Sequence, residues 1–393
     1  MRILSEKNMK KKIIGVVFGG RSVEHDVSII TAHNPIIDSL LATKKYEVVP
    51  IYIGKNGSWY SDPLMNDINF FRTDLEEKLS KLKKINLNLN GGLELIIPTT
   101  FGSQKIKIDI VFPAMHGTYG EDGSLMGLLR MANVPFVGCD IFASAVAMDK
   151  ILTKQVLRAE GSPTVKDVWF MKKDFERKRE KYLEQIKTLQ YPLFIKPVHL
   201  GSSIGISKAK NEAELINAIE VAFHYDDKVL VEEGVENLIE VTLPIMGNDD
   251  PVVAGIEKPL NKGEFFDYTE KYMKGGKKTG GVNSEYSEIP ANIDTELSAK
   301  VKELGLATYK TLGCSGIARV DFLIDGKSGQ IFINEVNTLP GSLYQHNWKK
   351  MGVSNIDLVE KLLAFAEERF IKGSKTDFAF SSDILNEYKG AKS

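Results

Sequence analysis

The residues best suited to chemistry lie near the C-terminal end of the chain, on two segments with the composition of β-strands. A short polar turn at 326–329 separates them and predicts a hairpin. Because side chains alternate along a strand, Arg319 and Asp321 share one face, as do Glu335 and Asn337. A five-residue loop would place Asp321 opposite Glu335 and Arg319 opposite Asn337. The two segments are Gly316–Asp325 and Gln330–Asn337.

This predicted cluster suits a divalent cation. Two carboxylates that face each other across strands repel, and bound cations would remove that conflict. Oxygen-only ligands are typical of Mg²⁺, which also bridges to substrate phosphates. Asp321, Glu335 and Asn337 are therefore candidate metal ligands. The alternative is a surface charge cluster that Arg319 and solvent neutralise.

A second candidate site follows the strand-like segment that ends at Lys196. The loop Gly201–Gly205 contains Ser202 and Ser203 between glycines. Backbone N–H groups, hydroxyls and a lysine can together hold a polyphosphate. The spacing is not that of a P-loop, and a plain glycine–serine turn is an equal alternative.

Two further candidates lie near the N-terminus, in loops that follow strand-like segments. Glu24 comes shortly after Gly19-Gly20 and could neutralise a substrate ammonium group, although an acidic residue at a helix start is a sufficient explanation by itself. His116 lies in the glycine-rich loop 116–123, where a lone histidine is more often incidental. No role is predicted for four other histidines: His33, His199, His224 and His346.

The elements that must position these residues alternate between strands and helices. The first third predicts strands at 13–18, 46–53 and 106–113 and a helix at 26–42, which indicates a parallel α/β sheet with ligands at its carboxyl edge. Residues 58–105 are less regular, with a helix or loop at about 74–84. Further helices are predicted at about 144–160, 171–190, 211–224, 294–312 and 354–370, and further strands at 191–197, 228–233, 239–246, 251–258, 316–324 and 330–337.

Length and composition set the broad class. The chain has 393 residues, which favours two or three domains. Its 51 basic and 52 acidic residues give a net charge of −1, so neither nucleic acid nor an anionic membrane is an expected partner. No segment approaches the about 18 apolar residues of a membrane span, and no signal peptide is evident. The two cysteines, Cys139 and Cys314, predict reduced packing residues. Either Met1 or Met9 could be the natural start.

Taken in order, these segments resemble the D-alanine–D-alanine ligase family of the ATP-grasp superfamily. The resemblance implies an α/β, α+β ATP-grasp architecture with three parts: an N-terminal parallel-sheet domain (1–142), a central subdomain (143–235) and a C-terminal subdomain (236–393) with a lid at about 261–288 and a polar tail at 373–393. The matching stretches are FGGRSVEHDVS, FPAMHGTYGEDGSLMGLL, VPFVGCDIFASAVAMDK, YPLFIKPVHLGSSIGISK, GIARVDF and INEVNTLPG.

The resemblance also implies the reaction. One D-alanine carboxylate would take the γ-phosphoryl group of ATP, and the amine of a second would attack the acyl phosphate, with two Mg²⁺ or Mn²⁺ ions. It implies a cytoplasmic homodimer in peptidoglycan precursor synthesis, and it implies residue roles. These are substrate binding by Glu24, His116 and Gly341; ATP binding by Lys150, Lys196, Ser202, Ser203, Glu232, Glu240 and Lys271; closure of the site by Tyr272 with Glu24 and Ser202; oxyanion stabilisation by Arg319; and metal binding by Asp321, Glu335 and Asn337.

The chain departs from the family pattern at two places. The lid beyond Lys271-Tyr272 is longer and richer in lysine and glycine. After Gly341, where the family has a Thr-Ser-His-Ser-Leu-like run for the second substrate, this chain has Ser342–Trp348. Two alternatives therefore stay open: a ligase that joins D-alanine to another acceptor such as D-serine, and a non-catalytic ATP-binding protein.

Overall fold

The computed structural model of the chain describes residues 11–260, 287–379 and 381–388. Most of the predicted lid, including Lys271 and Tyr272, lies outside the described residues. Within the described part, no helix has both the length and the apolar character needed to cross a membrane.

The first sheet is built largely from parallel strands, as predicted. Its order is β3-β2-β1-β7, and β1 pairs in parallel with both β2 and β7. Seven of the eight β1 residues are buried because helices cover both faces of the sheet. The strands are β1 (Lys12–Gly19), β2 (Tyr46–Ile53), β3 (Trp59–Tyr60) and β7 (Ile110–Pro113). The helices are α1 (His25–Thr31), a π-helical segment Ala32–Ile37, α2 (Asp38–Thr43) and α4 (Ser124–Met131).

The region 58–108 is more ordered than predicted. It contains short helices at Pro63–Asn66, Ile68–Phe71 and α3 (Leu75–Ser80), followed by an antiparallel sheet of β4 (Asn86–Asn88), β5 (Leu93–Thr99) and β6 (Gly102–Ile108). The prediction of one strand at 106–113 is wrong, because the chain changes sheets at Asp109. The Asp109 carboxylate accepts a 2.8 Å hydrogen bond from the Ile13 N–H, which fixes this change of direction.

The second sheet has the order β10-β9-β11-β8. Two long helices predicted here are each broken in two. Asp149 has an extended conformation between α5 and α6, and its carboxylate accepts hydrogen bonds from the N–H groups of Ile151 and Leu152. Lys178 separates α7 from α8. The elements are α5 (Ile141–Met148), α6 (Lys150–Ala159), β8 (Asp167–Met171), α7 (Lys172–Arg177), α8 (Arg179–Ile186), β9 (Leu193–Pro197), β10 (Ser207–Ala209), α9 (Glu212–Tyr225) and β11 (Lys228–Glu233).

The third sheet, of order β13-β12-β16-β17, carries the predicted hairpin. The prediction of one strand at 251–258 is wrong, because only residues near its two ends belong to strands. Residues 252–253 form β13, and residue 258 begins β14. The elements are β12 (Leu238–Gly247), β13 (Val252–Val253), β14 (Lys258–Pro259), β15 (Ser287–Glu288), α11 (Thr295–Thr311), β16 (Gly316–Asp325), β17 (Ile331–Asn337), a 3₁₀ turn Gly341–Tyr344, α12 (Gln345–Lys350), α13 (Asn355–Gly373) and α14 (Ile384–Glu387).

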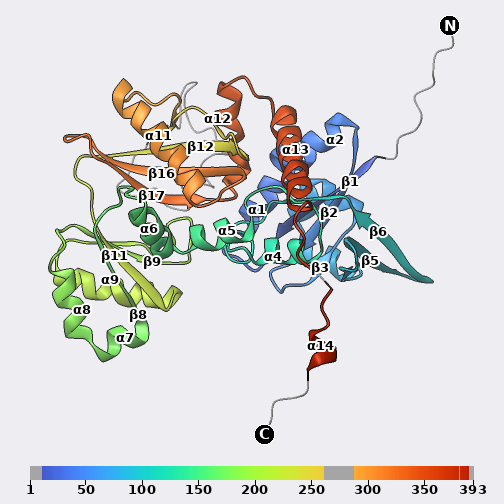
Figure 1. The fold of residues 1–393 in the computed structure, drawn as a ribbon, viewed down its shortest axis with the longest axis horizontal. Helices are drawn as coiled ribbons and strands as arrows, with labels where there is room; N and C mark the ends of the chain where they lie inside the picture. Colours follow the sequence, from blue (N-terminus) through green and yellow to red (C-terminus); the bar gives the residue numbers. More distant parts are fainter. Residues whose placement is uncertain (1–10, 261–286, 380, 389–393) are drawn as a thin grey trace.

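The C-terminal helix α13 joins the first and third sheets (Figure 1). Its buried residues Leu358 and Leu362 belong to the same core cluster as Ile36 and Leu40 of the N-terminal helices. The helix therefore closes the molecule by packing the end of the chain against its beginning. Both cysteines are buried and free, as the sequence predicted.

Candidate active site

The β16–β17 hairpin brings the four predicted polar residues together in the predicted register. Asp321 lies opposite Glu335, and Arg319 lies opposite Asn337. The pairing shifts between Asp321 and Phe322, so that Asn334 is an extra residue in β17. This bulge is required by the burial pattern. Ile331 and Ile333 face the core, and only an extra residue allows Glu335 to lie on the opposite face.

Charges within the hairpin neutralise one another. The Arg319 guanidinium donates two hydrogen bonds to Asp321, at 2.6 and 2.5 Å, and the Asn337 amide donates to Asp321 Oδ2 at 3.1 Å. Burial alone would lower the pKa of Arg319, but the charge and hydrogen bonds of Asp321, together with Tyr344 and Glu335, outweigh burial and raise the pKa. Glu335 lies 4.0 Å from both Arg319 Nη2 and Lys150 Nζ. This dense set of charges is half-buried and opens toward a pocket.

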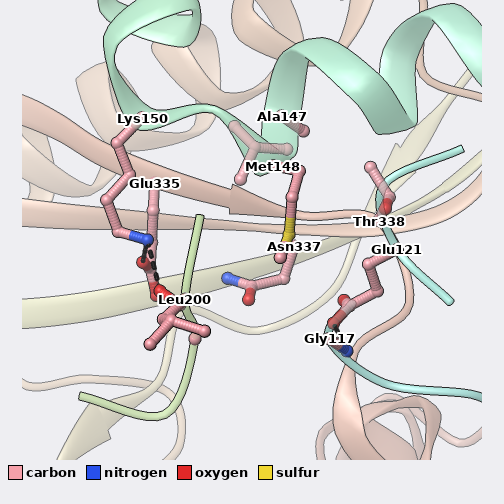
Figure 2. Close-up of a pocket in the computed structure, with 11 residues that line it drawn as sticks. Gly117, Glu121, Ala147, Met148, Lys150, Leu200, Glu335, Asn337 and Thr338 are labelled. Carbon is pink, nitrogen blue, oxygen red and sulfur yellow. Dashed lines mark hydrogen bonds and ion pairs between the residues drawn. The ribbon is translucent and has the colours of Figure 1, made fainter. Parts of the chain in front are cut away.

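The pocket lies between three parts of the chain (Figure 2). Glu335, Asn337 and Thr338 line it from the end of β17, and Lys150 projects from the first turn of α6. Gly117 and Glu121 line it from the loop after β7, and Leu200 and Gly201 from the loop after β9. Residues that follow strands of the first and second sheets thus meet residues of the third sheet at one site.

Two lysines and one glutamate form a buried cluster beneath this site. Glu232 is 2% exposed and contacts Lys154 at 2.5 Å as well as Lys196. Burial would raise the pKa of Glu232, but the two lysines outweigh it and lower the pKa to about 2. Lys196 also donates to Asn334 Oδ1 at 3.3 Å. The negative charges of Glu232, Glu335 and Glu240 raise the pKa of Lys196, so its ammonium group stays charged.

Glu24 lies where the loops after β1, β7 and β9 meet. Its side chain is 6% exposed and accepts a hydrogen bond from the Ser202 hydroxyl. A Cβ atom on Gly117 would lie 2.7 Å from Glu24 Oε2, and one on Gly201 would lie 3.1 Å from it. Larger residues at Gly117 or Gly201 would therefore displace the carboxylate. The two glycines therefore leave room for this buried carboxylate between the loops.

His116 and Glu121 connect the loop after β7 to the end of β17. His116 Nε2 is 2.8 Å from the Thr31 hydroxyl, which also accepts a hydrogen bond from the Ser342 N–H at 2.9 Å. Burial lowers the pKa of His116 to about 4, so the ring is neutral near pH 7. Burial and the charge of Glu24 raise the pKa of Glu121 to about 8. Glu121 accepts from the Gly117 N–H at 2.7 Å.

The segment after Gly341 folds over Arg319. Three consecutive residues, Ser342 to Tyr344, have positive φ angles of 46°, 53° and 52°. This turn places the Tyr344 ring 5.0 Å from the Arg319 guanidinium carbon, within cation–π distance. His346 pairs with the buried Glu257 at 3.0 Å. The surface that faces Arg319 is therefore an aromatic ring, and it is supplied by the segment Ser342–Trp348.

The structure brings most of the predicted residues to this region. Ser203 lies in the loop after β9 beside Ser202, both with positive φ, and Glu240 lies on β12 close enough to Lys196 to affect its pKa. The sequence missed five contributors: Thr31, Glu121, Lys154, Asn334 and Tyr344. Glu121 has an acidic side chain within the predicted glycine-rich loop, which is a usable signal. The other four depend on contacts between segments that are remote in sequence.

Comparison with known proteins identifies the family. Residues 13–139 match the family described as D-ala D-ala ligase N-terminus, and residues 156–364 match D-ala D-ala ligase C-terminus. A D-alanine–D-alanine ligase from Bacillus velezensis is 38% identical over 365 residues, covering 90% of this chain and 97% of the relative. A D-alanine–D-alanine ligase B from Clostridium tetani is 40% identical, with 91% and 94% coverage.

Solved structures agree with this result. The D-alanine–D-alanine ligase from Coxiella burnetii superimposes with a TM-score of 0.74 at 28% identity, covering 97% of this chain and 99% of that one. The VanG D-Ala:D-Ser ligase from Enterococcus faecalis also gives 0.74, at 34% identity with 91% and 100% coverage. The predicted ATP-grasp fold is thus confirmed. From its sequence and its fold alike, the chain belongs to the D-alanine–D-alanine ligase family.

Proposed function

We propose that the protein is an ATP-dependent ligase that joins two D-alanines through an acyl phosphate. The observation that carries this proposal is that a carboxylate, two ammonium groups and a polar hairpin meet around one pocket. The carboxylate of Glu24 lies against the lining residues Gly117 and Gly201. Lys150 lines the pocket and Lys196 contacts Asn334 beside it, and the hairpin of Arg319 and Asp321 supplies the lining residues Glu335 and Asn337. An amino acid, a polyphosphate and a transferring phosphoryl group need these three kinds of partner.

The hairpin residues fit magnesium by their chemistry. Asp321, Glu335 and Asn337 can offer oxygen ligands on one face of the hairpin. Asn334, the bulge residue, is not part of this set. Two ions held there would neutralise phosphate oxygens. Arg319 now satisfies Asp321, and a guanidinium released from that carboxylate would be free to contact a phosphoryl group. We propose Mg²⁺ or Mn²⁺ as the metal.

The chain's own residues account for binding and orientation of the first amino acid. Glu24 is placed to hold an ammonium group, and its contact with Ser202 links this group to the loop after β9. His116 would lie near the substrate carboxylate as a neutral ring, held by Thr31. Gly341 starts the turn that brings Ser342 to Thr31. Together these residues would orient the carboxylate toward ATP.

The lysines account for the phosphates. Lys150 and Lys196 supply positive charge, and the N–H groups and hydroxyls of Ser202 and Ser203 would cover the phosphate oxygens. We propose that Glu240 contacts the ribose side of the nucleotide. The Glu232 carboxylate is enclosed by two lysines, so we propose that it acts on ATP by positioning Lys196. Arg319 would stabilise the oxyanion of the tetrahedral intermediate. Lys271 and Tyr272 would complete the site from the lid.

The biological setting follows from the family. We propose that the product enters peptidoglycan precursor synthesis in the cytoplasm, and that the enzyme is a homodimer. D-Alanine, ATP and the metal are the expected small-molecule partners.

The second amino acid is open to one specific alternative, a D-serine acceptor. Two observations favour testing it: the similarity to a D-Ala:D-Ser ligase, and the altered wall made by Ser342–Trp348. The curated relatives named D-alanine–D-alanine ligase are more similar in sequence, at 38% and 40% identity. D-Alanine is therefore the preferred acceptor.

The test is phosphate release from ATP and Mg²⁺ with D-alanine alone, and then with D-alanine plus D-serine, D-lactate or L-amino acids, with products identified by mass. Release with D-alanine alone and a D-alanyl-D-alanine product is expected. Release that requires a second partner would move the acceptor assignment to that partner. ATP binding without turnover in any mixture would contradict the proposed activity and support a binding protein instead.

A further inference from the structure

His199, for which the sequence predicts no role, lies between two carboxylates. Its Nδ1 is 3.0 Å from Asp226 Oδ2, and its Nε2 is 3.3 Å from Asp149 Oδ2. The backbone N–H of His199 also donates to Asp226 Oδ2 at 2.8 Å. Asp226 ends α9, and Asp149 precedes α6. One residue thus links the ends of two helices to the loop after β9.

This geometry requires a charged ring. A neutral imidazole has one N–H, so its other nitrogen would turn a lone pair toward a carboxylate. Only the imidazolium form can donate to both Asp149 and Asp226. In agreement, hydrogen bonds to Asp149 and then to Asp226 raise the pKa of His199 to about 9.

The same contacts hold residues that are expected to bind phosphate. The Asp149 carboxylate caps α6, and the next residue, Lys150, donates to the Leu200 carbonyl at 2.7 Å. Leu200 follows His199 directly. The start of α6 and the loop after β9 are therefore joined twice, once by the His199 ring and once by Lys150. The loop then continues to Ser202, which contacts Glu24.

We propose that His199 is a positioning residue for ATP, which as an imidazolium fixes the loop containing Ser202 and Ser203 against the helix start that carries Lys150. This inference rests on the proposed function. His199 contacts neither substrate nor metal ligands, and it acts by keeping the loop hydroxyls and the Lys150 ammonium group in one arrangement.

The charged groups around the ring decide the sign of its pH dependence. Asp149 faces it from the start of α6 and Asp226 from the end of α9, and Lys228 of β11 contacts Asp149. Lys228 Nζ is 2.5 Å from Asp149 Oδ2, and it partly offsets that carboxylate. The two anions outweigh the one adjacent cation, so the charged ring is stabilised. Positioning depends on the charge of the ring in the folded protein, so the effect is present at pH 7 and is lost as the pH rises through the raised pKa of about 9.

The test compares His199→Gln with His224→Gln as a matched control. His224 lies in the last turn of α9, two residues before Asp226. A glutamine at 199 is neutral, and its one amide group cannot donate to both Asp149 and Asp226 as the imidazolium does. We expect His199→Gln to raise the KM for ATP about tenfold at pH 7, with the KM for D-alanine nearly unchanged. The melting temperature should also fall, because a pKa that is raised in the folded protein stabilises the fold. His224→Gln should match the unchanged protein.

The pH profile separates positioning from folding. For the unchanged protein, the KM for ATP should rise above about pH 9, whereas for His199→Gln it should already be high at pH 7 and nearly independent of pH. His199→Lys restores a cation, so it should recover part of the affinity at pH 7 and shift the alkaline rise upward. An unchanged KM for ATP in His199→Gln would overturn the inference. Equal rises in the KM for ATP and the KM for D-alanine would also overturn it, because they would indicate a general loss of structure.

Direct binding keeps this test independent of the ligase reaction. Calorimetry with a non-hydrolysable ATP analogue and Mg²⁺ should show about tenfold weaker binding for His199→Gln even if no amino acid is ligated. If His199→Gln binds the analogue more weakly but the unchanged protein shows no turnover, the role of His199 would be supported and the proposed activity contradicted. Equal analogue binding by the two proteins would overturn the role of His199, whatever the activity.

Discussion

At the scale of single residues, the most consequential group is the buried pair of lysines around Glu232. Glu232 and Lys154 are each 2% exposed, and both remain charged only because they neutralise each other. This arrangement holds the Lys196 ammonium group beside Asn334 of β17. It also makes the site sensitive to loss of a single carboxylate.

Glu232→Gln should destabilise the protein by roughly 3–5 kcal/mol, because two buried ammonium groups lose their counter-charge. Glu233→Gln is the matched control, since the ion pair of Glu233 with the largely exposed Lys166 is loose at 3.8 Å. A glutamine carbonyl can also keep the hydrogen bond that Glu233 accepts from the Gln190 N–H at 3.1 Å. Urea unfolding at pH 7 measures both free energies of unfolding. Equal values for the two variants would contradict the structural role of Glu232.

Acid should weaken the fold through the same residue. The pKa of Glu232 is about 2 in the folded protein and near 4.5 when unfolded, so the unfolded chain binds the proton first. The contribution of Glu232 is present above about pH 4.5 and is lost as the pH falls toward 2, about 3 kcal/mol in all. Unfolding free energies between pH 6 and 3 should fall more steeply for the unchanged protein than for Glu232→Gln. Parallel curves would rule this out.

Thr31 provides a second single-residue test. Its hydroxyl joins His116 to the Ser342 N–H, so Thr31→Val leaves two polar groups without this partner. We expect a loss of about 1–3 kcal/mol in stability and a higher KM for D-alanine, with the KM for ATP nearly constant. Thr43→Val is the control, because that hydroxyl also has two backbone partners, donating to the Leu40 carbonyl and accepting from the Lys45 N–H, and it lies away from the site. A rise in the KM for ATP alone would be inconsistent with this assignment.

At the scale of elements, the β-bulge at Asn334 decides which face of β17 carries the chemistry. Before Asn334 the strand alternates so that Ile331 and Ile333 face the core. After Asn334 it alternates so that Glu335 and Asn337 face the pocket. If Asn334 paired as a regular strand residue, Ile333 and Glu335 would lie on the same face. The bulge also presents the Asn334 side chain to Lys196.

Deletions in β17 should therefore have unequal effects. Removal of Asn334 keeps Ile333 facing inward and Glu335 facing the pocket, so we expect a folded protein with activity reduced mainly through the lost contact to Lys196. Removal of Val336 reverses the face of Asn337 and should abolish activity. Circular dichroism and phosphate release measure the two outcomes. Comparable activity in both deletions would show that the register is not decisive.

At the scale of the whole molecule, Arg369 on α13 joins the segment at 136–138, beside the first sheet, to Ser315, just before the third sheet. Its guanidinium donates to the carbonyl oxygens of Phe136 and Gly138 and to the Ser315 hydroxyl, with 2.7 Å for Phe136 and 2.5 Å for Ser315. The first and third sheets both supply a wall of the pocket. A contact that fixes them together therefore also preserves the pocket.

Arg369→Met should cost about 2–4 kcal/mol, because buried carbonyl groups lose a charged donor. Lys372→Met on the same helix is the matched control, since the ion pair of Lys372 with Asp249 is about two-thirds exposed on both sides, at 67% and 69%. Thermal unfolding measures both variants. A control that loses as much stability as Arg369→Met would show that the helix, and not this contact, is responsible.

Much of the site could be predicted from local sequence, because its residues lie at strand ends and in short loops. Alternation along β16 and β17 was enough to place Asp321 opposite Glu335, and the glycines after β1 and β9 marked the two loops around Glu24 and Ser202. The family resemblance was specific because six stretches occurred in a fixed order. These features depend on neighbours in sequence, where periodicity and turn chemistry operate directly.

Only the tertiary structure decided the rest, because it depends on contacts between remote segments. The helix at 144–160 breaks at Asp149, whose carboxylate serves as a helix cap and as a partner of His199 and Lys228. Glu232 gains its lysines from α6 and β9, and Arg319 is covered by Tyr344 through a turn of three residues with positive φ. Periodicity carries no information about which charge will find which counter-charge. Burial makes that pairing compulsory, and only the packed fold determines the partners.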